Sequence, residues 1–134
     1  MIEFDKVKDY RVLLVGDAIM DEYVYVAPIG KAIKENALSA LTGRREVFKG
    51  GVWAAAAHVR NFCAQVDIFT RPNVMWNTRL VDEIYLRKLF VLHELRPNGE
   101  TPQDWDIRSY DLVIVTDFGH GTLTQELIAR LSKE

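Results

Sequence analysis

Three aspartates follow segments that are typical of buried strands. Asp17 comes directly after the apolar run at 11–16, Asp21 follows four residues later, and Asp117 comes after a second such run at 110–116. Ligands of open α/β sheets bind beyond the carboxyl ends of the strands, and an ionised carboxylate offers several acceptor sites to hydroxyl groups. If the two strands are parallel neighbours, the three carboxylates converge on one crevice. A helix cap or a solvated turn is an equally good interpretation of the first pair.

Two adjacent glycines, Gly50 and Gly51, separate a strand predicted at 44–49 from a helix predicted from Val52 to about Cys63. Without a Cβ, such a corner lets backbone N–H groups approach a hydroxyl or an anion. The alternative is that the four alanines of this helix only allow close packing on a sheet. The predicted core face of the helix consists of Val52, Ala55, Ala56, Val59, Phe62 and Cys63.

The remaining elements follow from local pattern. The run at 11–16 predicts a central strand, and strand, helix and strand in succession around the Gly50-Gly51 corner predict a right-handed parallel crossover. Helix formers and periodicity in 78–95 favour a helix. A last helix is expected from Thr122 or Thr124, with Leu127, Ile128 and Leu131 on one face. Further strands are predicted at 23–26, ended by Pro28 and Gly30, at 66–70 and at 110–116, with turns or loops at 31–35, 42–43, 71–77 and 96–109.

Composition limits the classes of function. The chain has 134 residues, enough for one domain, and 17 basic against 19 acidic side chains give no electrostatic case for nucleic acid or an anionic membrane. The single cysteine, Cys63, cannot form an intrachain disulfide and suits a reducing cytoplasm. The three histidines lack the spacing of metal ligands, so no metal site is predicted. With no leader and no apolar span, a cytoplasmic protein is expected.

Four segments, residues 11–23, 48–59, 78–83 and 115–121, form an ordered series of motifs. In this order they resemble motifs of the ribokinase (PfkB) family of carbohydrate kinases, closest to the heptose-phosphate kinases of lipopolysaccharide-precursor synthesis. The resemblance covers nearly the whole chain and implies an α/β fold, a Rossmann-like ribokinase-type sheet with a small β lid, truncated, in one partial domain over 1–134. The lid strands would be about 23–26, 44–49 and 78–95. For 78–95 the resemblance predicts β structure, although this segment is rich in helix-forming residues. We adopt the prediction of β structure because local propensity is weak evidence.

The family's activity is ATP-dependent phosphoryl transfer to a sugar hydroxyl, and the resemblance implies roles for six residues. Asp17 would accept hydrogen bonds from the sugar, Asp21 would assist or hold the turn, and Asp117 would lie between the sugar and the phosphates. Gly50 and Gly51 would bring backbone amides to the sugar, and Arg79 would lie near the substrate. For Arg79, a solvated strand residue with a surface ion pair is an alternative.

The chain also departs from the family. The helix asparagine of the family falls at Ala57, and Ala32-Ile33 stands where a relative has Ser-Pro. A strand-and-helix segment is missing between Thr70 and Thr78, and the nucleotide-binding half with its Gly-Ala-Gly-Asp motif would follow Glu134. ATP and Mg²⁺ are therefore implied by the family, but binding by this chain alone is not expected, and no catalytic residue is assigned.

Two hypotheses of different classes remain open. The chain is the sugar-binding or sugar-phosphate-binding half of a kinase, active only when the nucleotide half is supplied, or it is a degenerate, non-catalytic module. In the second case the lid strands form a homodimer interface with Tyr23, Tyr25, Val47 and Phe48 as candidate contacts. The retained aspartates and glycines favour the first, and the losses at Ala57 and Ala32 favour the second. An unrelated nucleotide-binding domain is disfavoured because no G-x-G-x-x-G follows the first strand.

Overall fold

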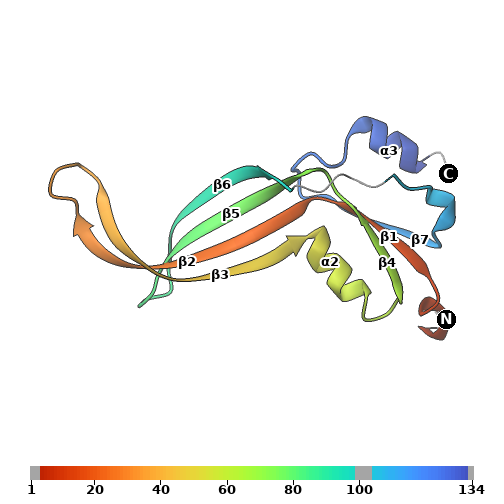
Figure 1. Ribbon diagram of the computed structural model, residues 1–134, viewed down its shortest axis with the longest axis horizontal. Helices are drawn as coiled ribbons and strands as arrows, with labels where there is room; N and C mark the ends of the chain where they lie inside the picture. The colour runs from red at the N-terminus through yellow and green to blue at the C-terminus, as the bar shows by residue number, and fades with distance from the viewer. Residues whose placement is uncertain (1–3, 99–103, 133–134) are drawn as a thin grey trace.

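The computed structural model describes residues 4–98 and 104–132, and it holds two sheets that meet where the chain passes Asp17 (Figure 1). A short helix, α1 (Phe4–Val7), precedes the first strand. One sheet is parallel and has helices on its faces, and the other projects away from it as a long lid. The predicted α/β class, with a Rossmann-like sheet and a β lid, is confirmed.

The parallel sheet has the order β4-β1-β7, with β1 (Arg11–Gly16) between β4 (Gln65–Phe69) and β7 (Leu112–Thr116). Alternate residues of β1 serve two cores. Val12 and Leu14 pack with α2 (Val52–Val59), whereas Leu13 and Val15 pack with Trp105 and α3 (Gln125–Ser132). The continuous apolar run of β1 is thus buried on both faces, as expected for a central parallel strand.

The lid is a four-stranded sheet of order β3-β2-β5-β6. Its strands are β2 (Ala18–Lys31), β3 (Leu38–Gly51), β5 (Asn73–Asp82) and β6 (Lys88–Pro97). β2 runs antiparallel to β3 and parallel to β5, and β5 runs antiparallel to β6. The β2–β3 hairpin continues to Lys31 and Leu38, past the last β2–β5 pair at Val26 and Asp82, and forms the projecting arm in Figure 1.

The lid corrects several predicted boundaries. The strands predicted at 23–26 and 44–49 are each part of a strand of fourteen residues, so Pro28, Gly30, Thr42 and Gly43 do not end them. Pro28 is tolerated because it lies beyond the β5 pairing, next to a register shift between Pro28 and Gly30. Pairing with neighbouring strands, which local sequence does not reveal, determined these lengths.

The segment after β4 also differs from the local pattern. The polar connection predicted at 71–77 contains the start of β5, and the helix that periodicity favoured at 78–95 is wrong, while the β structure implied by the resemblance is confirmed. In the loop predicted at 96–109, β6 continues to Pro97 and a 3₁₀ helix, η1, covers Ile107–Ser109. Residues 99–103 of that loop lie outside the described residues.

The crossover is parallel, but its partner differs from the prediction. β4 pairs with β1 and not with β3, which lies in the lid, so the chain runs from β1 through the β2–β3 hairpin and α2 to β4. Val52, Ala56 and Cys63 are buried as predicted, with Ala55 and Val59 packed against them. Phe62 lies beyond the end of α2 and is 61% exposed, so its place in the core is wrong.

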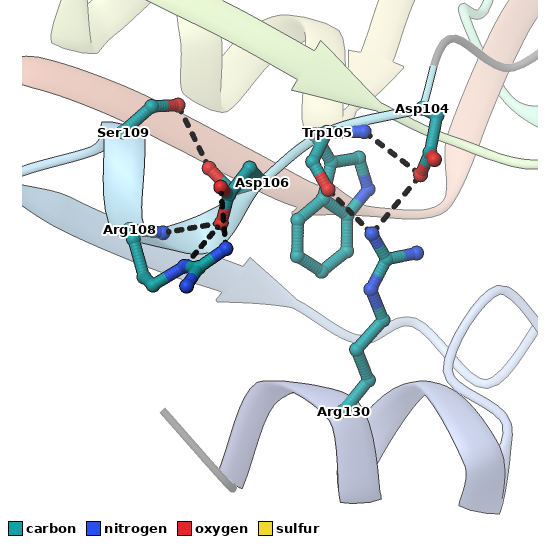
Figure 2. Close-up of polar contacts among 6 residues, drawn as sticks. All are labelled: Asp104, Trp105, Asp106, Arg108, Ser109 and Arg130. Carbon is teal, nitrogen blue, oxygen red and sulfur yellow. Dashed lines mark hydrogen bonds and ion pairs between the residues drawn. The ribbon is translucent and has the colours of Figure 1, made fainter.

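The opposite face of the parallel sheet is covered by residues 104–109 and α3, which Arg130 ties together (Figure 2). Arg130 of α3 bonds the carboxylate of Asp104 at 3.0 Å and the carbonyl oxygen of Trp105, and its guanidinium lies 4.0 Å from the centre of the Trp105 ring. Thr124 caps α3 as predicted, its hydroxyl accepting the Leu127 N–H. Leu127 and Leu131 join the core, but Ile128 is exposed.

None of the helices in the described ranges is long and apolar enough to cross a membrane.

Candidate functional site

Asp17 lies between β1 and β2 and is 2% exposed. Its carboxylate accepts three backbone hydrogen bonds from the loop after β7, from Phe118 at 2.9 Å, His120 at 3.1 Å and Thr122 at 2.9 Å. Burial alone raises the pKa of Asp17, but the hydrogen bonds from Thr122, Phe118 and His120 outweigh it and hold the pKa below its usual value. The ionised carboxylate therefore fixes the 117–122 loop against the end of β1.

Asp17 also fixes the start of α2. Its carbonyl oxygen accepts the Val52 N–H at 2.9 Å, and Gly51, just before the helix, has a φ of +59°. A Cβ at Gly51 would lie 2.2 Å from that carbonyl oxygen, so only glycine fits. The predicted two-glycine corner is thus a structural joint between the lid, β1 and α2.

Asp21 stands on the lid, in β2, and is held by two side chains from β5. Arg79 and Asn77 both donate to its Oδ1, Asn77 from 3.3 Å. Within the described part of the chain, Oδ2 of Asp21 makes no hydrogen bond, and the position that a Cβ of Gly50 would take lies 3.0 Å from it. The side chains of Asp21 and Arg79 are 27% and 19% exposed. A half-buried, oriented carboxylate therefore presents one acceptor oxygen beside an open backbone.

Two polar residues that the sequence analysis did not single out extend this arrangement. Asp21, Asn77 and His93 are directly paired across β2, β5 and β6, and Nδ1 of His93 lies 2.7 Å from Oδ1 of Asn77. The same face carries Tyr23, whose ring lies 5.2 Å from the Arg79 guanidinium and packs edge-on against Phe48. Only the strand register could have brought Asn77 and His93 to Asp21.

Asp117 follows β7, which pairs in parallel with β1, so the condition for the aspartates to lie near one another is met for these two strands. Its exposed side chain accepts the Gly119 N–H at 2.8 Å. The three predicted aspartates therefore have separate partners: Asp17 bonds the 117–122 loop, Asp21 bonds β5, and Asp117 bonds within its own turn. Asp17 and Asp117 mark the carboxyl edge of the parallel sheet, and Asp21 marks the adjoining lid face.

Two buried hydroxyl groups at the carboxyl edge of the parallel sheet have no hydrogen-bond partner among the described residues. They belong to Thr70, just after β4, and Thr116, at the end of β7. Thr116 is paired with Gly16, the last residue of β1. This edge, like the adjoining lid face with Asp21, has hydrogen-bonding capacity that the chain itself does not use.

The arrangement suits a neutral, hydroxyl-bearing ligand. The free Oδ2 of Asp21 accepts from hydroxyls, and the carboxylate is already charge-compensated by Arg79. In the parts of the chain that the structure describes, no three His, Cys, Asp or Glu side chains are grouped so that they could hold a metal ion.

No model of a known protein family matches the chain, and no curated protein matches it. Two solved structures, both from Agrobacterium tumefaciens, are similar to part of it. One is titled a "putative ribokinase" (15% identity, TM-score 0.38, 80% of this chain and 44% of that one) and the other a carbohydrate kinase (14%, 0.32, 63% and 35%). This chain therefore spans less than half of either structure. At TM-scores below 0.5, these matches add no functional evidence.

Proposed function

We propose that this chain is the substrate-binding portion of a carbohydrate kinase and binds a sugar or sugar phosphate at the polar face of the lid. The observation that carries the proposal is the hydrogen bonding of the two carboxylate oxygens of Asp21. Its Oδ1 is held by Asn77 and Arg79, and its Oδ2 is left as an acceptor next to Gly50. A fixed carboxylate with one free oxygen is the group that recognises a sugar hydroxyl.

The other predicted residues take supporting roles in this proposal. Asp17 holds the 117–122 loop and the start of α2, so it acts as a positioning residue and Asp21 makes the main sugar contact. Gly50 leaves room for the sugar, and Arg79 orients Asp21 while its cation lowers the cost of a half-buried carboxylate. Asp117, exposed at the sheet edge, stays a predicted contact for the far side of the ligand.

ATP and Mg²⁺ belong to the proposed reaction because the resemblance implies them. The described residues contain no group of three or more His, Cys, Asp or Glu side chains that could hold a metal ion. Phosphoryl transfer depends on positioning and on neutralising phosphate charge, so we assign no step of that reaction to this chain. In the proposal, transfer to the sugar hydroxyl requires a second polypeptide segment that supplies the nucleotide site.

The test is calorimetric titration of the purified chain with hexoses, heptoses and their phosphates, with and without ATP and magnesium. We expect saturable sugar binding without heat from ATP, and a loss of about tenfold or more in Asp21→Asn, which replaces an acceptor oxygen by a donor. Glu94→Gln is the matched control, since Glu94 lies on the opposite face of the lid and bonds Arg96. No sugar binding by the folded chain, or equal losses in both variants, would contradict the proposal.

A second candidate function is homodimerisation through the other face of the lid. By register, Val47, Leu80, Phe90 and Leu92 share that face, and all but half-buried Leu80 are exposed. A groove of about 400 Å³ at its far end is lined mainly by apolar residues, among them Val26, Pro28, Leu38 and Phe90. Exposed apolar surface of this kind is typical of protein interfaces. Of the four contacts predicted from sequence, Val47 lies on this face, whereas Tyr23, Tyr25 and Phe48 lie on the face of Asp21.

Light scattering over a range of concentrations tests the dimer. We expect Phe90→Ser to shift the chain toward monomer and Phe48→Ser, on the opposite face, to leave the mass unchanged. A monomer at all concentrations would contradict this second function without affecting the first.

A further inference from the structure

We propose that a pocket at the junction of the lid and α2 binds a small aromatic carboxylate. The pocket has a volume of about 250 Å³ and is lined from both parts, by Met20, Lys49, Val74 and Trp76 of the lid and by Trp53 of α2. We call it the tryptophan pocket. The inference is independent of the proposed sugar-binding function and concerns a separate surface.

The tryptophan pocket lies on the face of the lid opposite Asp21. Lys49, Met20 and Trp76 are directly paired across β3, β2 and β5, so their side chains share one face. Met20 precedes Asp21 in β2, and successive side chains of a strand point to opposite faces. A ligand in the tryptophan pocket therefore contacts a surface that the proposed sugar site does not use.

The apolar lining of the pocket favours a flat ring. Trp53, Trp76 and Met20 are half-buried and pack against the core cluster that contains buried Val74. Aromatic rings pair with one another edge-on or in offset stacks, which stabilises them beyond the burial of area alone, and the thioether of methionine also contacts rings favourably. The pocket should therefore bind an aromatic ring more tightly than a saturated ring of similar size.

The charge beside the pocket favours an anion. The ammonium nitrogen of Lys49 lies 5.4 Å from the centre of the Trp53 ring, and the guanidinium of Arg96 lies 4.3 Å from the centre of the Trp76 ring. Arg96 is paired with Glu94 at 2.8 Å, whereas exposed Lys49 makes no ion pair or hydrogen bond within the described residues. The uncompensated ammonium has three N–H donors, and a carboxylate is the group that matches them in charge and in hydrogen bonding.

The volume limits the size of the ligand. A cavity of about 150 Å³ is enough for one benzene molecule, whereas drug-sized ligands occupy pockets of roughly 300–1,000 Å³. At about 250 Å³ the tryptophan pocket has room for one ring with a short acidic substituent and is too small for a nucleotide. The ligand class is therefore a one-ring aromatic acid.

Calorimetric titration of the purified chain with three probes tests the proposal. Phenylacetate has the ring and the charge, phenylacetamide has the ring without the charge, and cyclohexylacetate has the charge without the aromatic ring. Each probe is titrated to about 20 mM, because a ligand of this size that fills a matching pocket binds in roughly the millimolar range or more tightly. We expect phenylacetate to bind most tightly and each of the other two about three- to tenfold more weakly.

Lys49→Met tests the role of the charge, since it keeps an apolar stem and removes the ammonium. This variant should weaken phenylacetate binding by about three- to tenfold and leave phenylacetamide binding unchanged. Lys88→Met is the matched control. Lys88 is also an exposed lysine of the lid, but it pairs with Val81 near the end of β5, away from Trp76. It should change the binding of neither probe.

Four results would overturn the proposal. Absence of saturable phenylacetate binding by the folded chain would mean that no such site exists. Equal weakening of the acid and the amide in Lys49→Met would mean that Lys49 contributes packing and not charge. Cyclohexylacetate binding as tight as that of phenylacetate would mean that the pocket selects apolar volume and not an aromatic ring. Loss of phenylacetate binding in Asp21→Asn would place the acid in the proposed sugar site.

Discussion

Two strands with similar sequences, β1 and β6, have opposite environments. β1 contains Val-Leu-Leu-Val at 12–15, and these residues are at most 1% exposed. β6 contains Leu-Phe-Val-Leu at 89–92, and Leu89, Phe90 and Leu92 are 50–60% exposed. β1 lies between two strands and between two covered faces, whereas β6 is the last strand of the lid, and neither described core cluster includes a residue of β6. An apolar run therefore predicts a strand, but its burial depends on the layers around it.

The parallel sheet with its helices is therefore the part that stabilises the fold, and the lid is the part with exposed faces available for binding. Both described cores are built around β1, and the lid contributes to one of them only through residues near the junction of the two sheets, such as Ala18 and Val74. The lid presents a polar and aromatic face with Asp21 and an apolar face with Phe90. Substitutions in the first part should change the free energy of unfolding, and substitutions in the second should change binding or association.

The largest effect is expected from matched truncations in the two strands. Leu14→Ala in β1 should cost about 4 kcal/mol of unfolding free energy, since the site is fully buried, whereas Leu92→Ala in β6 should cost less than about 1 kcal/mol. Urea denaturation of the two variants at a concentration where the chain is monomeric measures both. Similar losses would mean that Leu92, which is 50% exposed, is as important to the packing of the fold as Leu14.

A smaller effect is expected at the aspartates. Asp17→Asn should cost about 3 kcal/mol, because an amide nitrogen would face a backbone N–H that now donates to the carboxylate. Asp21→Asn should cost less than about 1 kcal/mol, since the half-buried pair with Arg79 lies on the lid face. Thermal unfolding of both variants measures the difference, and a larger loss for Asp21→Asn would reverse the structural and binding roles proposed for the two residues.

The acid sensitivity of the parallel sheet should follow Asp17. Its pKa in the folded chain lies below the usual value of about 3.9, so the unfolded chain binds the proton more tightly. The stabilisation is complete above that value and is lost as the pH falls through the lowered pKa. Unfolding free energies between pH 7 and pH 2.5 should therefore decline more steeply in the wild-type chain than in Asp17→Asn. Exposed carboxylates such as Asp106, whose pKa is also lowered, are common to both proteins and cancel in the comparison.

The smallest effect is expected from a surface ion pair of the parallel sheet. Arg11 bonds Asp67 at 2.9 Å, but both side chains are largely exposed. Arg11→Met should change the unfolding free energy by less than about 0.5 kcal/mol, because exposed pairs are screened by solvent. A loss above about 1 kcal/mol in the same urea experiment would show that the start of β1 and β4 depends on charge as well as on the core.

Much of the parallel-sheet part could be predicted from the sequence, because its signals are local. The apolar runs at 11–16 and 110–116 indicated two buried strands, which are parallel neighbours in the structure. The glycine pair indicated the corner before α2, and Thr124 was one of two predicted caps of α3. The lid could not be predicted in the same way from the residues alone. Helix formers pointed to a helix at 78–95, and Pro28 and Gly43 pointed to chain turns, but strand pairing overrode both.

The candidate site divides along the same line. The sequence by itself determined that carboxylates follow buried strands and that a two-glycine corner lies before a helix, since both depend on neighbours in the chain. Only the tertiary structure decided that Asp17 bonds a loop more than 100 residues away and that Asp21 meets Asn77 and His93. The physical reason is register: a shift of one residue in a strand moves every side chain to the other face, and nothing within the strand itself determines that shift.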